Sequence, residues 1–177
     1  MSVHDENNHT IYKCRKCGVL YRDVDNHICQ NNIKMDNTDR KRLSWEETAL
    51  KLAFNIAEYR SPDPHVQVGA IIIKNDNDIV VGYNGAPSGV EIDWSDRDER
   101  RKRVIHAEEN VLSKVKRGDI KIMAVTALPC EICLKSAANK GVKRIIYQDE
   151  LIGYDHSLTK QLAKEFKIEL IRLNLDL

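Results

Sequence analysis

The sequence of 177 residues lacks several features that would each assign it to a special class of protein. No apolar run is long enough to cross a bilayer, so we expect no transmembrane helix and no membrane partner. Neither sign of charge dominates, because 28 lysines and arginines stand against 27 aspartates and glutamates. This balance argues against a protein that wraps nucleic acid by charge alone. Glycine and proline are also few, with 8 and 4 residues, which excludes fibrous and linker-like chains.

The first thirty residues are polar and lack the apolar stretch of a signal peptide. We therefore expect a cytoplasmic protein, or one in the host cytoplasm if the gene is viral, where cysteines rarely form disulfides. Its five cysteines are then better explained as thiols or metal ligands. Hydrophobic residues make up 42% of the chain and charged residues 31%, which is typical of a globular protein.

Composition divides the chain into three segments. Residues 1–30 hold three of the five cysteines, residues 31–43 form a polar linker, and apolar periodicity begins at residue 44 and continues to residue 177. In this last segment Ser44 and Glu47 form a capping box, and the helix that follows should end near Arg60 because prolines come next. We expect further helices over 104–115, 130–140 and 158–166, and strands over 66–73, 78–83, 121–127, 142–147 and 168–173. The first two strands form a hairpin and the rest alternate with helices, which predicts an α/β sheet covered on both faces.

Two short motifs carry the chemistry: His106-Ala107-Glu108, and Cys130 and Cys133 preceded by a proline. One histidine and two cysteines supply three zinc ligands and leave a fourth position for water. Both motifs open predicted helices, where the helix dipole stabilises thiolates and other anions. Glu108 lies close enough to carry a proton without being a ligand. Taken singly these are ordinary residues, or a redox pair in the case of the cysteines, but the ordered set is the signature of zinc nucleobase deaminases.

Residues 44–177 resemble the cytidine deaminase superfamily, and within it the deoxycytidylate (dCMP) deaminases. Beyond the two motifs, the resemblance is carried by residues 60–64 (RSPDP), 68–70 (VGA), 82–89 (GYNGAPSG) and 141–147. With a histidine as the first ligand, His106, the chain resembles the nucleotide or nucleic-acid branch of the superfamily, since free-nucleoside deaminases usually have a cysteine at this position. The resemblance implies a three-layer α-β-α fold with a five-stranded mixed sheet. Glu109 departs from the family, which commonly has leucine at this position.

The resemblance further implies hydrolytic deamination of dCMP to dUMP and ammonia with one catalytic zinc ion. Glu108 would accept the proton of the attacking water, pass it to ring N3 and help the amino group to leave as ammonia. The family also implies a homo-oligomer, often a hexamer, and dCTP or dTTP as effectors with Mg²⁺.

Five substrate contacts are expected by the same resemblance. Asn84 would bond the sugar or base, Ala107 would offer its backbone to the base, and Tyr147 would pack against the nucleotide. Arg60 and Ser61 are candidates for the 5′-phosphate, because arginine makes bidentate phosphate contacts. Four of them have a plainer explanation: Asn84 as a turn residue, Tyr147 as a strand-end tyrosine, Arg60 as a helix C-terminal cation and Ser61 as a loop residue.

A charged stretch over residues 97–103 holds five positive and two negative side chains before the histidine motif. It would either meet a triphosphate, as substrate or effector, or form a solvated loop or helix start. This keeps a dCTP deaminase as an alternative.

The amino-terminal segment contains a second candidate metal site, formed by Cys14, Cys17, His27 and Cys29. Four such ligands suffice for a closed structural zinc site, and a segment this short needs a metal to fold. The alternative is free reduced thiols. Basic residues and two tyrosines in this segment leave open a nucleic-acid clamp, an oligomer contact or a regulatory element.

Two other functional classes remain to be weighed. A polynucleotide deaminase acting on DNA, RNA or tRNA is not favoured, because the net charge is near zero and the loop over residues 82–89 is dCMP-like. A non-catalytic zinc-binding interaction protein would have no need of a proton carrier such as Glu108.

Overall fold

The computed structural model describes residues 3–4, 10–13, 20–22 and 42–175. It divides into two units, residues 1–42 and residues 43–177. In the first unit the strands β1 (Val3–His4), β2 (Thr10–Lys13) and β3 (Leu20–Arg22) form an antiparallel sheet in the order β1-β2-β3. The four predicted ligands Cys14, Cys17, His27 and Cys29 lie outside the described residues.

The second unit is built on a five-stranded sheet in the order β5-β4-β6-β7-β8. Its strands are β4 (Gly69–Ile73), β5 (Ile79–Tyr83), β6 (Ile122–Ala127), β7 (Arg144–Asp149) and β8 (Glu169–Arg172). β4 runs antiparallel to β5 and β6, whereas β6, β7 and β8 are parallel. The sheet is therefore mixed, as the resemblance implied.

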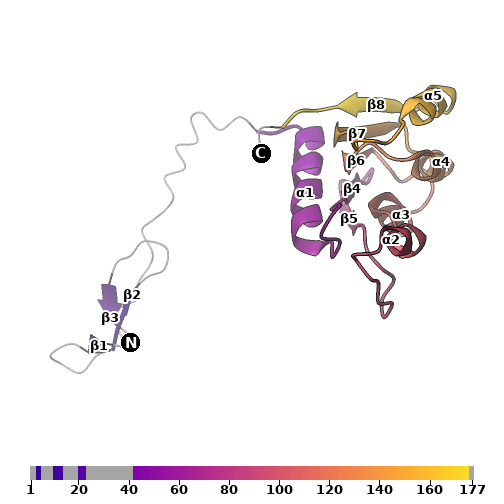
Figure 1. The fold of residues 1–177 in the computed structure, drawn as a ribbon. Helices are drawn as coiled ribbons and strands as arrows, with labels where there is room; N and C mark the ends of the chain where they lie inside the picture. Colours follow the sequence, from indigo (N-terminus) through magenta and orange to yellow (C-terminus); the bar gives the residue numbers. More distant parts are fainter. Residues whose placement is uncertain (1–2, 5–9, 14–19, 23–41, 176–177) are drawn as a thin grey trace. The chain divides into compact units, whose positions relative to one another are not determined.

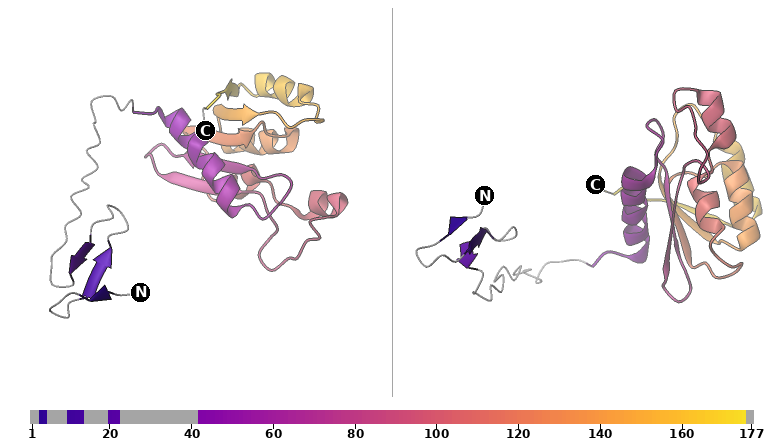
Figure 2. Two further views of the ribbon diagram at one scale, coloured as in Figure 1. Left: turned by 60° about the vertical axis from the view of Figure 1, so that its left-hand side comes forward. Right: turned by 90° about the horizontal axis from the view of Figure 1, so that it is seen from below.

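Helices cover both faces of this sheet, which makes three layers (Figure 1). Helix α1 (Trp45–Arg60) covers one face, and α3 (Ala107–Leu112), α4 (Glu131–Lys140) and α5 (Ser157–Glu165) cover the other; the view from below in Figure 2 shows the sheet between them. The short helix α2 (Arg97–Arg103) lies on the same side as α3. The predicted α/β class and three-layer arrangement are confirmed.

Helix α1 begins and ends where the sequence predicts. The Ser44 hydroxyl accepts a hydrogen bond from the Glu47 backbone N–H at 3.1 Å, and the Glu47 carboxylate accepts from the Ser44 N–H at 2.8 Å. The helix buries a face of small and aliphatic side chains against the sheet: Ala49, Leu50, Ala53 and Ala57. It ends at Arg60, before the two prolines that cannot continue it.

Alternate residues of β4 and β6 divide the core between the two faces of the sheet. Ile71 and Ala124 pack on the α1 side, whereas Ile72 and Val125 pack on the side of α3, α4 and α5. All residues of these two strands are buried, because both faces are covered by helices. Two central strands of this kind are a rigid base for the loops at their ends.

Two glycines allow helices to approach the sheet closely. A Cβ atom on Gly69 would lie 1.9 Å from the Ala53 carbonyl oxygen of α1, and one on Gly82 would lie 2.6 Å from the Ala107 carbonyl oxygen of α3. Both distances are far below van der Waals contact. Glycine is required at these positions because any side chain would push a helix away.

The largest difference from the sequence prediction concerns residues 97–115. The predicted helix over 104–115 is confined to Ala107–Leu112. Its start is delayed because Ile105 pairs with Gly85 as an isolated β-bridge. The charged stretch before it forms α2, whose N-cap Asp96 accepts from the Asp98 N–H at 2.8 Å and the Glu99 N–H at 3.1 Å. A capping aspartate, acidic residues in the first turn and arginines in the last turn explain this helix.

At the edge of the sheet, the Val81 carbonyl oxygen of β5 accepts a hydrogen bond from the Lys114 ammonium at 2.7 Å. Across the described residues, no helix combines the length and the apolar character that a membrane crossing requires.

Candidate active site

The two helix starts that carry the sequence motifs meet at one place. His106 is the N-cap residue of α3 and Cys130 that of α4, with Cys133 in the first turn of α4. His106 Nδ1 lies 3.4 Å from Cys133 Sγ and 3.7 Å from Cys130 Sγ. The three ligand atoms lie within 4.8 Å of one another, and they form the one group in the described part of the chain that is suited to hold a metal ion.

The geometry of these three residues fits zinc. A tetrahedral zinc ion with a Zn–N distance of about 2.0 Å and a Zn–S distance of about 2.3 Å places nitrogen and sulfur about 3.5 Å apart. The two measured nitrogen–sulfur distances, 3.4 and 3.7 Å, bracket this value. Imidazole nitrogen and thiolate sulfur are also the donors that zinc prefers over calcium or magnesium. The donor set therefore suits a zinc site with three protein ligands and one open position.

Hydrogen bonds within the group shift the pKa values of Cys130 and His106 in opposite directions. The pKa of the Cys130 thiol is lowered to about 4, first by the hydrogen bond from the Cys133 thiol and further by His106 and the Cys133 N–H. The pKa of His106 is raised to about 9, chiefly by its hydrogen bond with Cys130. A metal ion needs the imidazole neutral and the thiols ionised, so its binding releases protons from this group.

Glu108 lies in the first turn of α3, immediately beside the ligands, and its side chain is buried. Burial raises the pKa of this carboxyl group to about 7. A divalent cation in the adjacent site would lower this pKa again. The position suits a group that takes up and releases a proton near neutral pH.

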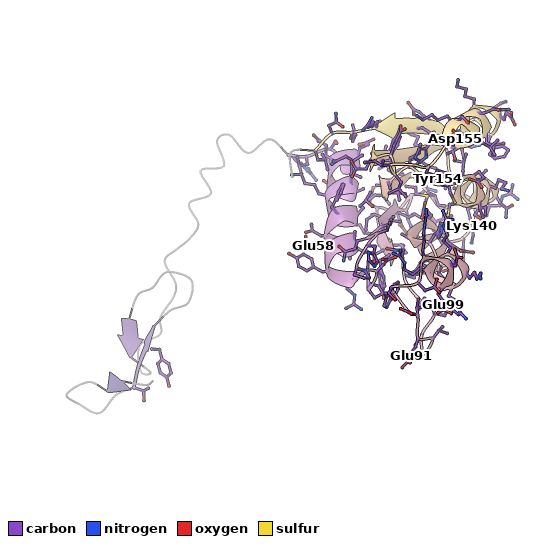
Figure 3. All side chains as sticks on the ribbon, in the orientation of Figure 1. Glu58, Glu91, Glu99, Lys140, Tyr154 and Asp155 are labelled. Carbon is purple, nitrogen blue, oxygen red and sulfur yellow. The ribbon has the colours of Figure 1, made fainter. Side chains whose placement is uncertain are left out.

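A pocket of about 370 Å³ opens onto these groups. His106, Glu108 and Cys130 form part of its lining, together with apolar side chains from the loop before β4 and from the end of β6. α2 and the loop over residues 151–156 contribute the remaining wall. Figure 3 shows Glu99 of α2 and Tyr154 of this loop on the side of the sheet opposite Glu58 of α1. The volume is in the range of small-molecule sites.

Asn84 lines the pocket and is buried. Its side-chain oxygen accepts from the Ser61 hydroxyl and from the Val68 N–H, both at 2.7 Å. Its amide nitrogen donates to the Val66 carbonyl oxygen at 2.8 Å. Asn84 thus fixes the loop that forms one wall of the pocket.

The other predicted substrate contacts divide into two groups. Ala107 lines the pocket, as Asn84 does. Arg60 is exposed and lies 5.7 Å above the Tyr83 ring, while the Ser61 hydroxyl is engaged by Asn84. Tyr147 is buried in β7, where its hydroxyl donates to Glu150 at 3.3 Å. The last three do not line the pocket.

Among the buried polar residues of the pocket wall, sequence reasoning missed two. Asp63 is buried, accepts from the His65 and Val66 N–H groups at 2.8 and 3.1 Å, and lies 3.3 Å from an Arg100 nitrogen. His156 is the N-cap residue of α5 and is also buried. An acidic residue between two prolines gives a turn signal that predicts Asp63 as a loop anchor, but nothing in the sequence distinguishes His156 from a surface histidine.

Comparison with known proteins agrees with this geometry. The family model described as the cytidine and deoxycytidylate deaminase zinc-binding region matches residues 43–149, more than half of the chain. Human deoxycytidylate deaminase is 36% identical over 119 residues, which cover 61% of this chain and 66% of the human protein. Deoxycytidylate deaminase of Mycobacterium phage D29 is 32% identical over 126 residues, covering 62% of this chain and 98% of the phage protein.

A solved structure supports the same assignment. The apo dCMP deaminase of cyanophage S-TIM5 is 26% identical, with a TM-score of 0.58, and the match covers 75% of this chain and all of the phage protein. The resemblance inferred from the two motifs is therefore confirmed, with the three-layer fold that it implied. The chain belongs to the zinc-binding cytidine and deoxycytidylate deaminase family.

Proposed function

We propose that this protein is a zinc-dependent hydrolase that converts dCMP to dUMP and ammonia. The observation that carries the proposal is the meeting of His106, Cys130 and Cys133 at distances that fit zinc, beside the buried Glu108. His106, Cys130 and Glu108 also line one pocket. Support also comes from the 36% identity to human deoxycytidylate deaminase. The reaction supplies the deoxyuridine nucleotide needed for thymidylate synthesis.

The zinc ion would be held by His106, Cys130 and Cys133. When bound there, zinc lowers the pKa of a coordinated water and so provides a nucleophile near neutral pH. Glu108 accepts one proton from the water that attacks C4 of cytosine and delivers it to ring N3; it then accepts the second proton, from the hydroxyl group now on C4, and passes it to the departing amino group. Ammonia leaves and the C4 carbonyl of the uracil product forms, so each proton that Glu108 accepts is returned to the product side.

The walls of the pocket would orient the nucleoside. Asn84 and Ala107 line the pocket, and Asn84 is held in place by three hydrogen bonds to its own loop. One N–H of its amide remains to bond a sugar or base oxygen, because an asparagine amide has two donors. The rigid loop means that this donor needs no reordering when the substrate binds.

Ammonia release from the purified protein tests the proposal. We would offer dCMP, dCTP, deoxycytidine and a cytosine-containing single strand, with Glu108→Gln as the inactive variant. Loss of the proton carrier should lower kcat by about 10² to 10⁴-fold while the zinc content is unchanged. The neighbouring Glu109, which is exposed, offers a matched control: Glu109→Gln should keep the wild-type rate.

Other outcomes of this assay would change the assignment. Turnover of dCTP alone would favour the triphosphate alternative, and turnover of the strand alone would favour a polynucleotide deaminase. Full activity in Glu108→Gln would contradict the proposed role of this carboxylate.

A second zinc ion, an oligomer and nucleotide regulation complete the proposal. The amino-terminal zinc rests on the spacing of Cys14, Cys17, His27 and Cys29. A hexamer and regulation by dCTP or dTTP with Mg²⁺ rest on the family resemblance alone. Sedimentation of the protein with and without these nucleotides would test both.

A further inference from the structure

The pocket lined by Glu108, His106 and Cys130 is also lined by three arginines of α2: Arg97, Arg100 and Arg101. They are spaced three and four residues apart, so they share one face of the helix. Lys102 and Arg103 belong to the same helix but do not line the pocket, and Arg103 pairs with Glu99 of its own helix at 2.5 Å. The positive side chains of α2 therefore fall into two groups, and only the group of three arginines lines the pocket.

One of these three charges is already matched. An Arg100 guanidinium nitrogen lies 3.3 Å from the Asp63 carboxylate, whose exposure is only 6%, and this carboxylate also anchors the loop before β4. The ion pair therefore holds α2 against the pocket loop. Among the described residues, Arg97 and Arg101 have no carboxylate partner, so two positive charges in the pocket wall remain without a counter-charge.

Two buried polar atoms of residues that line this pocket have no hydrogen-bond partner among the described residues. They are Arg100 Nε and His156 Nδ1. Both residues line the pocket, and His156 is 8% exposed, with its other ring nitrogen 3.4 Å from the Leu151 carbonyl oxygen. Because buried polar atoms are nearly always paired, these two indicate where a polar ligand group is received.

We propose that Arg97 and Arg101 bind the 5′-phosphate of the substrate, with Arg100 as the positioning residue that fixes α2 through Asp63. The inference rests on the proposed function, which it deepens by naming the phosphate site. A phosphate monoester carries about −1.5 to −2 charge at pH 7, which two guanidinium groups neutralise. Arginine also presents paired N–H donors that fit phosphate oxygens.

This site makes the enzyme specific for a nucleoside monophosphate. A nucleoside lacks the group that Arg97 and Arg101 bind, and a triphosphate brings more negative charge than two arginines neutralise. The phosphate is thereby assigned to α2, rather than to Arg60 and Ser61, neither of which lines the pocket.

Steady-state kinetics of Arg97→Gln, Arg101→Gln and the double variant test the inference. We expect kcat/KM for dCMP to fall about tenfold or more in each single variant and at least about 100-fold in the double variant, mainly through KM. The low rate on deoxycytidine should stay within about twofold of wild type. Lys102→Gln removes one positive charge from the same helix outside the pocket, and it should leave kcat/KM for both dCMP and deoxycytidine unchanged.

Binding of dCMP to the Glu108→Gln protein, measured by calorimetry, separates this inference from the proposed function. The phosphate site is supported if Arg97→Gln and Arg101→Gln weaken dCMP binding when combined with Glu108→Gln, whereas Lys102→Gln does not. This result would hold whether or not the wild type turns dCMP over. Equal dCMP binding in all these proteins overturns it, even if dCMP is the substrate. Preference of the wild type for dCTP overturns the monophosphate specificity. If the double variant does not fold, the single variants test the phosphate site instead. Arg101→Lys retains the positive charge, so it should weaken dCMP binding less than Arg101→Gln does.

Discussion

At the scale of single residues, Asn84 shows why an amide is needed where a loop meets the pocket. Its oxygen accepts two hydrogen bonds and its nitrogen donates one, and the partners come from Ser61, Val66 and Val68. A carboxylate offers only acceptors and a hydrophobic side chain offers neither. Only asparagine meets this pattern, because glutamine has the same donors and acceptor but a side chain that is too long.

Asn84→Asp should therefore destabilise the protein by about 2–4 kcal/mol, because it places an oxygen against the Val66 carbonyl and buries a charge. Ser61→Ala removes one hydroxyl only and should lower the free energy of unfolding by about 1 kcal/mol. Urea unfolding measures both effects. Asn174 is exposed, so Asn174→Asp is the control and should be close to neutral. Equal stability of the two Asn→Asp variants would show that the hydrogen bonds of Asn84 contribute little.

The residues of the metal group could be located from the sequence, whereas most of the pocket wall could not. His106, Cys130 and Cys133 follow from fixed spacings at helix starts, and the structure brings them together. The sequence predicts Arg60 and Ser61 at the phosphate; in the structure neither lines the pocket, and hydrogen bonds from Ser61 and Val68 to Asn84 fix the loop after α1. Such long-range pairing leaves no periodic signal in the chain.

At the scale of elements, Gly69 and Gly82 set how closely α1 and α3 approach the sheet from opposite faces. The consequences differ, because α3 carries Glu108 and follows His106, whereas α1 carries none of the candidate zinc ligands. The two glycines thus offer a matched pair of substitutions: Gly82 contacts the helix that carries the site, and Gly69 contacts the helix on the opposite face of the sheet.

Gly82→Ala should displace α3, lower the free energy of unfolding by about 1–3 kcal/mol or more, and weaken zinc binding. Gly69→Ala should destabilise at least as strongly, since its Cβ would lie closer to backbone, but the folded fraction should bind zinc normally. Urea unfolding and zinc titration of the folded proteins give the two readouts. A normal zinc affinity in Gly82→Ala would mean that α3 tolerates the shift without moving His106.

Helices and strands could be predicted where the apolar pattern of the sequence is strong. They could not be predicted where backbone pairing with a distant segment overrides that pattern. The five strands and α1 follow from buried alternation, β-branched runs and a capping box. Residues 104–105 have helical spacing, but the bridge between Ile105 and Gly85 holds them extended. α2 is a helix whose pattern is one of charge and capping rather than of apolar periodicity, so its existence was left open.

At the scale of the whole molecule, the metal group joins parts of the chain that are distant in sequence. His106 is 24 residues from Cys130 and 27 from Cys133, and strand β6 separates the two helices in the chain. Zinc binding at this group therefore stabilises the folded second unit, by about 2.7 kcal/mol at a free zinc concentration 100 times Kd.

Metal analysis of cysteine variants should resolve the two zinc sites. We expect two zinc ions per chain in the wild type and one in Cys130→Ser, which should also lose dCMP turnover and have a lower Tm. The double variant Cys14→Ser and Cys17→Ser should also hold one ion but retain its turnover of dCMP. A single ion in the wild type, lost in Cys130→Ser, would show that the amino-terminal zinc prediction is wrong.

The hydrogen bond from Lys114 to the Val81 carbonyl affects how separate molecules behave toward one another. β5 is an edge strand of the sheet, and its Ile79 and Val81 side chains are exposed. An open edge of this kind is a template on which a strand of a neighbouring chain can add, which is the first step of aggregation. The Lys114 ammonium occupies one acceptor of that template and places a charge where an incoming apolar strand would lie. A single side chain from the turn after α3 thus limits the addition of further strands at this edge of the sheet.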